Sequence, residues 1–269
     1  MNLRTRIFFR FFGLLHCISF LCAKSRRDFK MPDYYKVVEK NDFLQQKSNA
    51  ILNHFNISVN VEGFENVPNG PCLIIPNHST YLDPLIMWSA LWNHRDGSKQ
   101  SKLVNFVARK EITKKKMVKR IADLGQTYYI DTQNPREALA TLKDFGQFIK
   151  KNKSCGVIFA EGTRTKDGKL GEFHSGAFKL AQSSYLTIVP ATINNAANAL
   201  DWNRKEKLEV KVTFHKPMKP IQFQSLDSRV LAEQVKSIVA SDYIDQTITS
   251  NETIKNKYSK RDKVKEVKR

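Results

Sequence analysis

The sequence predicts an α/β fold: a mostly parallel central sheet flanked by helices, preceded by an N-terminal helical segment that associates with a membrane. From residue 57 onward, short apolar runs that suit buried strands alternate with helical patterns, which is typical of a parallel sheet covered on both faces. An aromatic-rich apolar stretch between basic clusters near the N-terminus predicts the membrane segment. With 269 residues, 41% of them hydrophobic, the chain can bury one well-packed core.

Residues 1–30 are expected to anchor the chain to a membrane. A mostly apolar stretch, residues 7–23, holds five phenylalanines and has basic residues on both sides. As a helix it would reach about 25 Å, which is short of a hydrocarbon core roughly 30 Å thick. Arg10 and His16 disfavour a spanning helix further. A shallow interfacial anchor is therefore favoured, with a spanning helix and a cleavable signal peptide as the alternatives.

Hydrophobic periodicity assigns the remaining elements in order. Residues 33–55 carry apolar side chains at helical spacing, which predicts a helix packed against the domain. The alternating pattern predicts strands at residues 57–61, 72–76, 103–108, 127–131, 155–160, 186–193 and 208–214. Helical patterns predict helices at residues 83–93, 113–124, 135–151, 176–184 and about 227–242. Pro135 suits a first helical position, and Gly125 suits a helix stop.

The chain is strongly basic. Its 45 lysines and arginines against 26 acidic residues give a net charge of +19, which attracts nucleic acid, an anionic bilayer or an anionic substrate. Residues 251–269 hold eight of these cations and few apolar residues, which predicts a basic, mobile tail. The four cysteines are scattered without a C-x-x-C pair, so we expect neither a disulfide frame nor a metal site.

Two polar motifs follow two of the predicted strands. Residues 77–84 come directly after the strand at 72–76, and residues 161–164 come directly after the strand at 155–160. In an open parallel sheet, chemistry collects in the crevice beyond the carboxyl ends of the strands. The two motifs are therefore expected to converge on one cleft.

The first motif contains His78 and Asp83. A neutral imidazole can take a proton from an alcohol, and a carboxylate can hold its tautomer and stabilise the imidazolium. Alone, this spacing is a weak signal, because a surface histidine beside a helix-capping aspartate gives the same pattern.

The second motif contains Glu161, Gly162, Thr163 and Arg164. The guanidinium of Arg164 is a planar fork that matches phosphate, and Gly162 lets backbone N–H groups approach an anion. The alternative is a charged turn in which Arg164 pairs with Glu161 or Asp167.

With these blocks in order, the sequence resembles the glycerolipid acyltransferase family over about residues 57–214. Residues 77–84 match the family's His-(x)4-Asp block, residues 161–164 continued by 167–170 match its third block, and residues 188–193 match its fourth. The resemblance implies an acyltransferase domain over residues 31–250. It implies transfer of a fatty acyl group from acyl-CoA or acyl carrier protein to the free hydroxyl of 1-acyl-sn-glycerol-3-phosphate, giving phosphatidic acid. Glycerol 3-phosphate and another lysolipid are alternative acceptors.

The resemblance also implies a role for each site residue, with no covalent intermediate, metal or cofactor. His78 is the general base on the acceptor hydroxyl, and Asp83 orients it. Arg164 binds the acceptor phosphate, while Gly162, Thr163 and nearby N–H groups complete the substrate-binding loop. Glu161 is expected to brace Arg164 or the loop rather than to titrate in the reaction.

The family's second block is where the chain departs from the pattern. Tyr129, Ile130 and Asp131 fit that block, but Thr132 stands where an arginine belongs. In the family that arginine looks like part of the phosphate site. Arg136, four residues later near a predicted helix start, is the expected substitute.

A second basic cluster surrounds the predicted helix at 113–124: Arg109, Lys110, Lys114, Lys115, Lys116, Lys119 and Arg120. One interpretation of this cluster is a solvent-exposed helix face without a ligand. The alternative is a surface that rests on anionic lipid. We expect the protein to be membrane-associated, on the cytoplasmic face of the cell membrane. A basic nucleic-acid-binding module is disfavoured because no such motif occurs. An inactive lipid-binding protein is disfavoured by His78 and Asp83.

Overall fold

The computed structural model describes residues 1–32, 34–94, 100–165 and 167–249. Its strands are β1 (Ile57–Glu62), β2 (Cys72–Pro76), β3 (Val104–Arg109), β4 (Tyr128–Ile130), β5 (Cys155–Val157), β6 (Thr187–Asn194) and β7 (Leu208–Phe214). Its α-helices are α1 (Leu3–Phe9), α2 (Phe11–Lys30), α3 (Val37–His54), α4 (Asp83–Ala90), α5 (Lys116–Leu124), α6 (Pro135–Asn152), α7 (Gly176–Ser183) and α8 (Ser228–Ala240). The 3-10 helices are η1 (Phe64–Asn66), η2 (Lys110–Lys114) and η3 (Pro220–Gln222).

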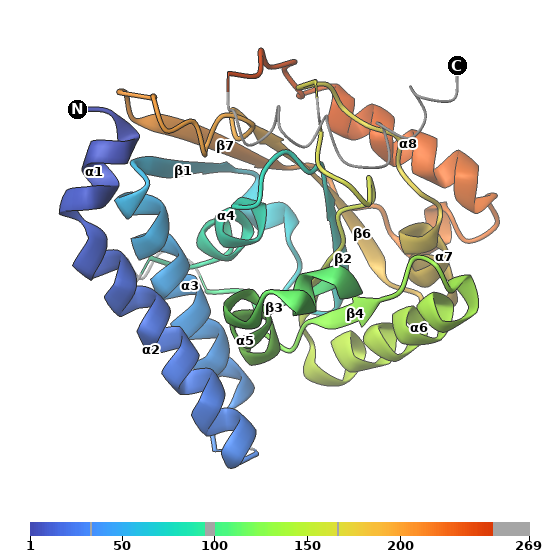
Figure 1. The fold of residues 1–269 in the computed structure, drawn as a ribbon. Helices are drawn as coiled ribbons and strands as arrows, with labels where there is room; N and C mark the ends of the chain where they lie inside the picture. The colour runs from blue at the N-terminus through green and yellow to red at the C-terminus, as the bar shows by residue number, and fades with distance from the viewer. Residues whose placement is uncertain (33, 95–99, 166, 250–269) are drawn as a thin grey trace, which may run out of the picture.

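The seven strands form one sheet in the order β1-β7-β6-β2-β5-β3-β4 (Figure 1). Every neighbouring pair is parallel except β6 and β7, whose register pairs Ala191 with Phe214. The prediction of a mostly parallel sheet flanked by helices is therefore confirmed. Because β2, β5, β3 and β4 run in the same direction, the loops that follow them emerge at one edge.

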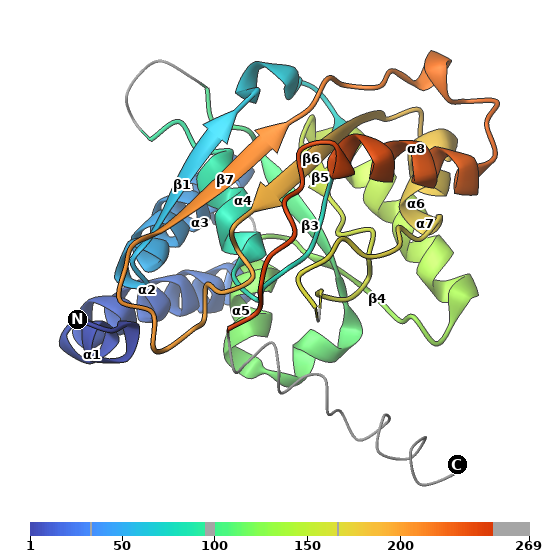
Figure 2. The same ribbon diagram turned by 90° about the horizontal axis from the view of Figure 1, so that it is seen from above.

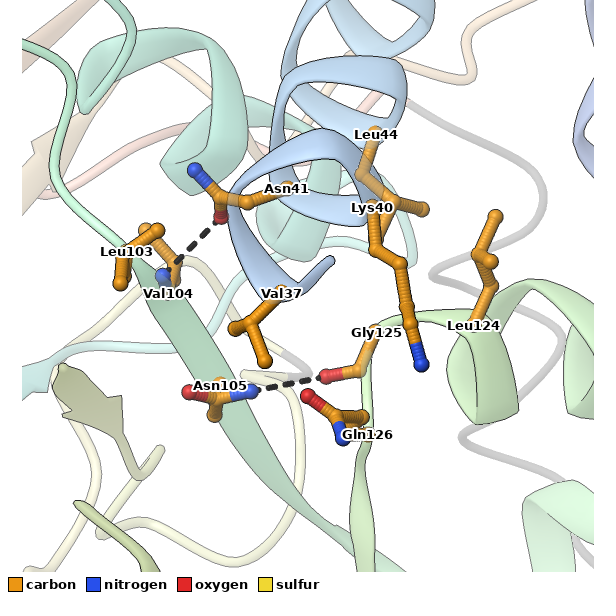
Figure 3. A pocket seen from close by; sticks show the side chains of 10 residues that line it. All are labelled: Val37, Lys40, Asn41, Leu44, Leu103, Val104, Asn105, Leu124, Gly125 and Gln126. Atoms are coloured by element: carbon orange, nitrogen blue, oxygen red, sulfur yellow. Dashed lines mark hydrogen bonds between the residues drawn. The ribbon is translucent and has the colours of Figure 1, made fainter. Parts of the chain in front are cut away.

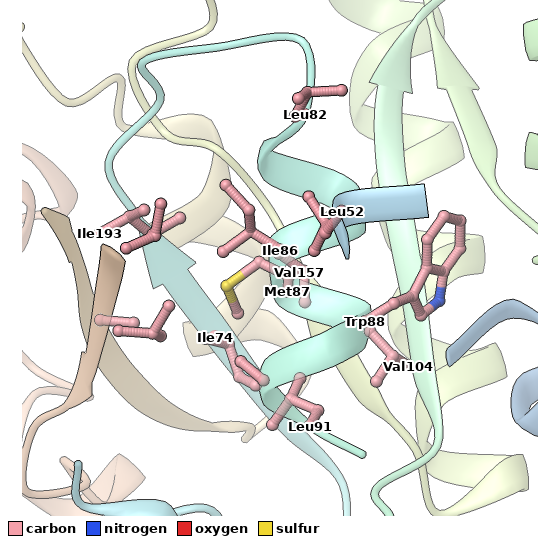
Figure 4. Close-up of a cluster of buried hydrophobic side chains, with 14 of the residues drawn as sticks. Leu52, Ile74, Leu82, Ile86, Met87, Trp88, Leu91, Val104, Val157 and Ile193 are labelled. Atoms are coloured by element: carbon pink, nitrogen blue, oxygen red, sulfur yellow. The ribbon is translucent and has the colours of Figure 1, made fainter. Parts of the chain in front are cut away.

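Helices cover both faces of this sheet, with α2, α3 and α4 on one side and α6, α7 and α8 on the other (Figure 2). Alternation along β2 produces the two cores: Ile74 joins the cluster under α3 and α4, whereas Leu73 and Ile75 join the cluster under α6, α7 and α8. The first cluster includes Ile86, Met87 and Trp88 of α4 packed against strand residues (Figure 4).

The helix predicted over 33–55 begins at Val37, the helix predicted over 83–93 ends at Ala90, and two further elements are shortened or divided. The strand predicted over 155–160 ends at Val157, and Phe159 leaves the ladder to stack on the ring of His78, with centroids 4.3 Å apart. The helix predicted over 113–124 is divided into η2 and α5, because Lys115 has an extended backbone, with φ −94° and ψ 94°. The tail predicted over 251–269 lies outside the described residues.

The N-terminal segment forms two helices instead of one. Leu3 and Arg4 donate backbone hydrogen bonds to the 202–204 loop, and α2 packs on α3 and α5, so the chain bends at Arg10. Within the described ranges, no single helix combines the length and apolar composition needed to cross a bilayer. Helices α1 and α2 meet that requirement only as a pair, and the bend between them is 71°.

Candidate functional site

The first polar loop is fixed where β2 ends. The side chain of Asn77 is buried and clamps the loop to β6: its Nδ2 donates to Ile193 O at 3.0 Å, and its Oδ1 accepts from Ile193 N at 2.7 Å. This pair of hydrogen bonds spans 116 residues of sequence. It places the next residue, His78, at the carboxyl edge of the sheet.

His78 and Asp83 form a hydrogen-bonded pair. Nδ1 of His78 lies 2.7 Å from Oδ2 of Asp83, and the same oxygen accepts the N–H groups of Ser79 at 2.6 Å and Thr80 at 2.9 Å. We assign the proton to Nδ1, because its partner is an acceptor for two other donors. Nε2 then carries a free lone pair on a ring whose side chain is 19% exposed. Such an imidazole can accept a proton from a substrate.

Asp83 does not act as a helix cap. It is the first residue of α4, and its fully buried carboxylate accepts from Ser79 and Thr80, which precede the helix, instead of from the first helical N–H groups. The helix-capping interpretation of the motif is therefore wrong. The carboxylate is instead committed to the loop that carries His78.

The second polar loop holds the backbone of His78 from both sides. His78 N donates to Oε1 of Glu161 at 2.6 Å, and His78 O accepts from Thr165 N at 2.8 Å. The other carboxylate oxygen of Glu161 accepts from Gly171 N at 2.9 Å. Glu161 thus braces the loops, and no contact to Arg164 is present within the described residues.

Glu161 is 5% exposed, and its burial is the main reason that its pKa is raised to about 7. The two backbone N–H donors from His78 and Gly171 act in the opposite direction, because they stabilise the ionised form. Burial therefore prevails over hydrogen bonding at this carboxyl. The group is consequently near its midpoint of protonation at neutral pH.

The remaining residues of the loop have different surroundings. Gly162 has a φ of +66°, which favours glycine, and its own N–H donates to Phe159 O at 3.0 Å. The N–H that seats an anion would therefore have to come from another residue. Thr163 is exposed. Arg164 is half-buried, and its Cζ lies 3.4 Å from the centroid of the Tyr81 ring.

A C-terminal strap, residues 241–249, braces the same loop through contacts that the sequence does not predict. Figure 2 shows the strap running back from α8 across the molecule. The hydroxyl of Tyr243 donates to Gly168 O at 2.8 Å, and Gln246 N donates to the same carbonyl at 3.0 Å. Since some 75 residues separate Tyr243 from Gly168, no local pattern could have revealed this contact.

Gly168 is required by this packing. Its φ is +80°, and a Cβ there would approach the carbonyl oxygen of Gln246 to 1.8 Å. We expect Gly168→Ala to lower the free energy of unfolding by about 2 kcal/mol or more, as typical for a strained residue that also clashes. Chemical denaturation measures this. Gly70→Ala is the matched control, since its Cβ would meet nothing within 4 Å. Equal stabilities of the two variants would show that the strap is not packed on Gly168.

Arg136, the expected substitute for the family arginine, is not the residue that contacts Thr132. Arg136 is exposed at the second position of α6, and it makes no ion pair or hydrogen bond within the described ranges. Instead, Arg109 at the end of β3 places Nη2 3.3 Å from Oγ1 of Thr132. The sequence gives no clue to this contact, because the neighbourhood of β3 and β4 is known only from the sheet order.

A small pocket lies away from these loops, between α3, β3 and the end of α5 (Figure 3). Two of its side chains bond to backbone groups of the same lining: Asn41 accepts from Val104 N, and Asn105 donates to Gly125 O. It therefore belongs to the packing of α3 on β3. In the described part of the chain, no group of three or more His, Cys, Asp or Glu side chains could hold a metal ion.

Comparison with known proteins supports the resemblance seen in the sequence. A family model described as Acyltransferase matches residues 58–194. The chain is 32% identical over 186 residues to a probable 1-acyl-sn-glycerol-3-phosphate acyltransferase of Mycoplasma genitalium, a match that covers 66% of this chain and 67% of the relative. It is 31% identical over 149 residues to the 1-acyl-sn-glycerol-3-phosphate acyltransferase of Saccharomyces cerevisiae, covering 52% of this chain and 44% of that one.

The fold is similar to a solved structure. The crystal structure of the 1-acyl-sn-glycerophosphate (LPA) acyltransferase PlsC from Thermotoga maritima matches with a TM-score of 0.65 and 21% identity, over 89% of this chain and 92% of that one. At this identity the likeness shows the fold alone. It extends over most of the chain, beyond the residues that the family model matches.

Proposed function

Because the chain belongs to the acyltransferase family, we propose that it transfers a fatty acyl group from an acyl thioester to the free hydroxyl of 1-acyl-sn-glycerol-3-phosphate, giving phosphatidic acid. The observation that carries this proposal is the His78–Asp83 pair, 2.7 Å apart, whose Nε2 is open beside a loop that holds a half-buried arginine. The names of the relatives supply the acceptor. Glycerol 3-phosphate or another lysolipid is the alternative acceptor within the same chemistry.

In this mechanism the acceptor reacts directly with the thioester. Nε2 of His78 takes the proton of the acceptor hydroxyl as its oxygen attacks the carbonyl carbon, and Asp83 stabilises the imidazolium that forms. When the tetrahedral intermediate collapses, the C–S bond breaks, and the departing thiolate takes the proton back from the imidazolium. No acyl-enzyme is needed, and the proton balance closes without a metal or another cofactor.

Two arginines are candidates to hold the acceptor phosphate. Arg164 has no carboxylate partner within the described residues. Arg109 pairs with Glu111 at 3.3 Å and lies beside Thr132, where the family has an arginine. A planar guanidinium can bind phosphate through two N–H groups at once. We therefore propose Arg109 for the function of the missing arginine, with Arg136 as the alternative.

Replacing each arginine with alanine separates these assignments. Arg109→Ala is expected to raise the KM for the acceptor about tenfold or more, because a charge-assisted contact to phosphate is lost. Arg136→Ala is expected to leave that KM unchanged. Initial rates at a saturating donor concentration measure both. If only Arg136→Ala raised the KM for the acceptor, the phosphate site would lie at α6 instead.

The acyl donor is a thioester of coenzyme A or of acyl carrier protein. Both donors carry phosphate, and the basic cluster around η2 and α5 offers exposed lysines to either of them. The choice between the two donors requires a direct comparison of rates with each.

We propose that the protein acts on an anionic membrane surface, on the cytoplasmic face of the cell membrane. Helices α1 and α2 expose the large aromatic side chains of Phe8, Phe9, Phe12 and Phe29, each more than 70% accessible. A surface hollow beside α1 is lined by Phe8, Phe9 and Trp202 together with Arg4. Exposed aromatic and basic side chains together suit a shallow interfacial contact.

Neutralising the basic cluster tests the membrane contact. Replacing Lys114, Lys115 and Lys116 with glutamine is expected to weaken binding to vesicles that contain anionic lipid by about 100-fold, since each cation near the surface contributes about 1 kcal/mol. Vesicle co-sedimentation measures this. Glutamine at Lys143, Lys150 and Lys151, exposed on α6, is the matched control for net charge. Equal losses in both triple variants would indicate a nonspecific charge effect.

A panel of acceptors tests the proposed reaction. Purified protein with acyl-CoA or acyl-ACP is offered 1-acyl-sn-glycerol-3-phosphate, glycerol 3-phosphate or a neutral 1-acylglycerol, and the products are identified by mass spectrometry. We expect phosphatidic acid from the first acceptor. Product from glycerol 3-phosphate alone would keep the reaction and change the acceptor. No product from any acceptor, by folded and lipid-bound protein, would favour an inactive lipid-binding protein.

A further inference from the structure

The ring of Tyr81 lies where three loops of the site meet. Tyr81 belongs to the loop after β2, Arg164 to the loop after β5, and Lys115 to the junction of η2 and α5, which follows β3. Since β2, β5 and β3 are successive neighbours in the sheet, these loops leave its edge side by side. Cζ of Arg164 lies 3.4 Å from the ring centroid of Tyr81, and Nζ of Lys115 lies 5.0 Å from it.

This arrangement leaves the polar edges of both cations available. A guanidinium that stacks on an aromatic ring is held by its face, so its N–H groups still point outward in the plane. Within the described ranges, neither Arg164 nor Lys115 forms an ion pair with a carboxylate. Two cations held against one ring repel each other, and an anion bound next to both relieves that repulsion.

Tyr81 contributes its ring and not its hydroxyl. The side chain is 49% exposed, and the structure records no hydrogen bond to its hydroxyl within the described residues. Its place in the chain is also specific, because it lies between His78, the proposed base, and Asp83. A ligand bound by the two cations on the ring would therefore lie at the loop that carries the proposed base.

We propose that Tyr81 is a positioning residue for the phosphomonoester of the acceptor. Its ring orients the guanidinium of Arg164 toward the phosphate and brings Lys115 to the same anion as a second cation. This inference rests on the proposed function, from which it takes the phosphate-bearing acceptor. It adds the group that selects phosphorylated acceptors over neutral ones.

Two variants of Tyr81 test the role of the ring. Tyr81→Phe keeps the aromatic face, and we expect its kinetics to stay within about twofold of the native chain. Tyr81→Leu removes the face at similar bulk. We expect it to raise the KM for 1-acyl-sn-glycerol-3-phosphate about tenfold with little change in kcat or in the KM for the donor. With 1-acylglycerol, which has the same hydroxyl and no phosphate, we expect no difference between the leucine variant and the native chain.

A double-mutant cycle adds a second readout. Because both cations act through the same ring, adding Lys115→Gln to Tyr81→Leu should raise the acceptor KM by less than Lys115→Gln does in the native chain. Full additivity would overturn the shared site. So would an equal loss by the leucine variant on both acceptors, or a loss by Tyr81→Phe as large as that by Tyr81→Leu.

Failure of the proposed function can be told apart from failure of this inference. If the native chain acylates no acceptor, the proposed function fails, and glycerol 3-phosphate then serves as the probe in calorimetric titrations. The inference holds if the native chain and Tyr81→Phe bind it while Tyr81→Leu binds about tenfold more weakly. Equal affinities for the three proteins, or no binding by the native chain, overturn it.

Discussion

Replacing His78 with alanine is expected to lower the rate of acyl transfer by about 10²–10⁴-fold, the usual contribution of a general base. The backbone of His78 is held by Glu161 and Thr165 through its own N–H and C=O groups, and these contacts do not need the imidazole. The variant should therefore fold and bind the acceptor. Steady-state rates give the loss, and circular dichroism and thermal unfolding check the fold.

His174→Ala is the matched control for this variant. His174 is an exposed histidine next to the same loop, and its ring lies 3.2 Å from the position that a Cβ on Gly162 would occupy. It should keep native activity because it has no role in the mechanism. If His174→Ala abolished transfer and His78→Ala did not, the base would have been assigned to the wrong histidine.

Replacing Glu161 with glutamine is expected to change how stability depends on pH. The pKa of Glu161 in the folded protein is raised to about 7 from an ordinary value of 4.5, so the folded protein binds this proton more tightly than the unfolded chain does. The stabilisation of the folded protein by this bound proton is complete below pH 4.5 and is lost as the pH rises through about 7. The shift corresponds to about 3 kcal/mol in the free energy of unfolding.

Urea unfolding measures the free energy of unfolding of the native chain and of Glu161→Gln between about pH 5 and about pH 8. The difference between the two curves of free energy against pH is the contribution of Glu161. The glutamine variant should also be less active, because its amide would direct N–H groups at the N–H of His78 or of Gly171. Glu172→Gln, an exposed neighbour, is the control and should keep the native pH dependence. Parallel curves for Glu161→Gln and the native chain would contradict the account.

The fold was predictable because its signals are local. The β2 and β7 boundaries match the predicted ranges, since β2 is a short apolar run and β7 alternates apolar with polar residues. The alternation of strands and helices then predicts a parallel sheet without any knowledge of long-range contacts. The same geometry explains why His78 and Glu161, 83 residues apart, meet at the carboxyl edge.

The details of the site were less predictable because they depend on contacts between distant segments. Arg109 reaches Thr132 across two neighbouring strands, and Tyr243 reaches Gly168 from the strap, so neither contact leaves a spacing that can be read along the chain. The bend at Arg10 arises because the 202–204 loop binds α1 while α2 packs elsewhere. The sequence predicts that Glu161 braces Arg164 or the loop, but only its two hydrogen bonds reveal which groups it braces.

Direct acyl transfer is tested by following one labelled acyl group in a single reaction. The purified protein, with lipid present, is given an acyl thioester labelled in its acyl chain, with or without 1-acyl-sn-glycerol-3-phosphate. Direct transfer predicts that the label enters phosphatidic acid when the acceptor is present and is not retained on the protein when the acceptor is absent. Label bound covalently to the protein would contradict direct attack by the acceptor, and absence of labelled phosphatidic acid from folded protein would contradict the reaction itself.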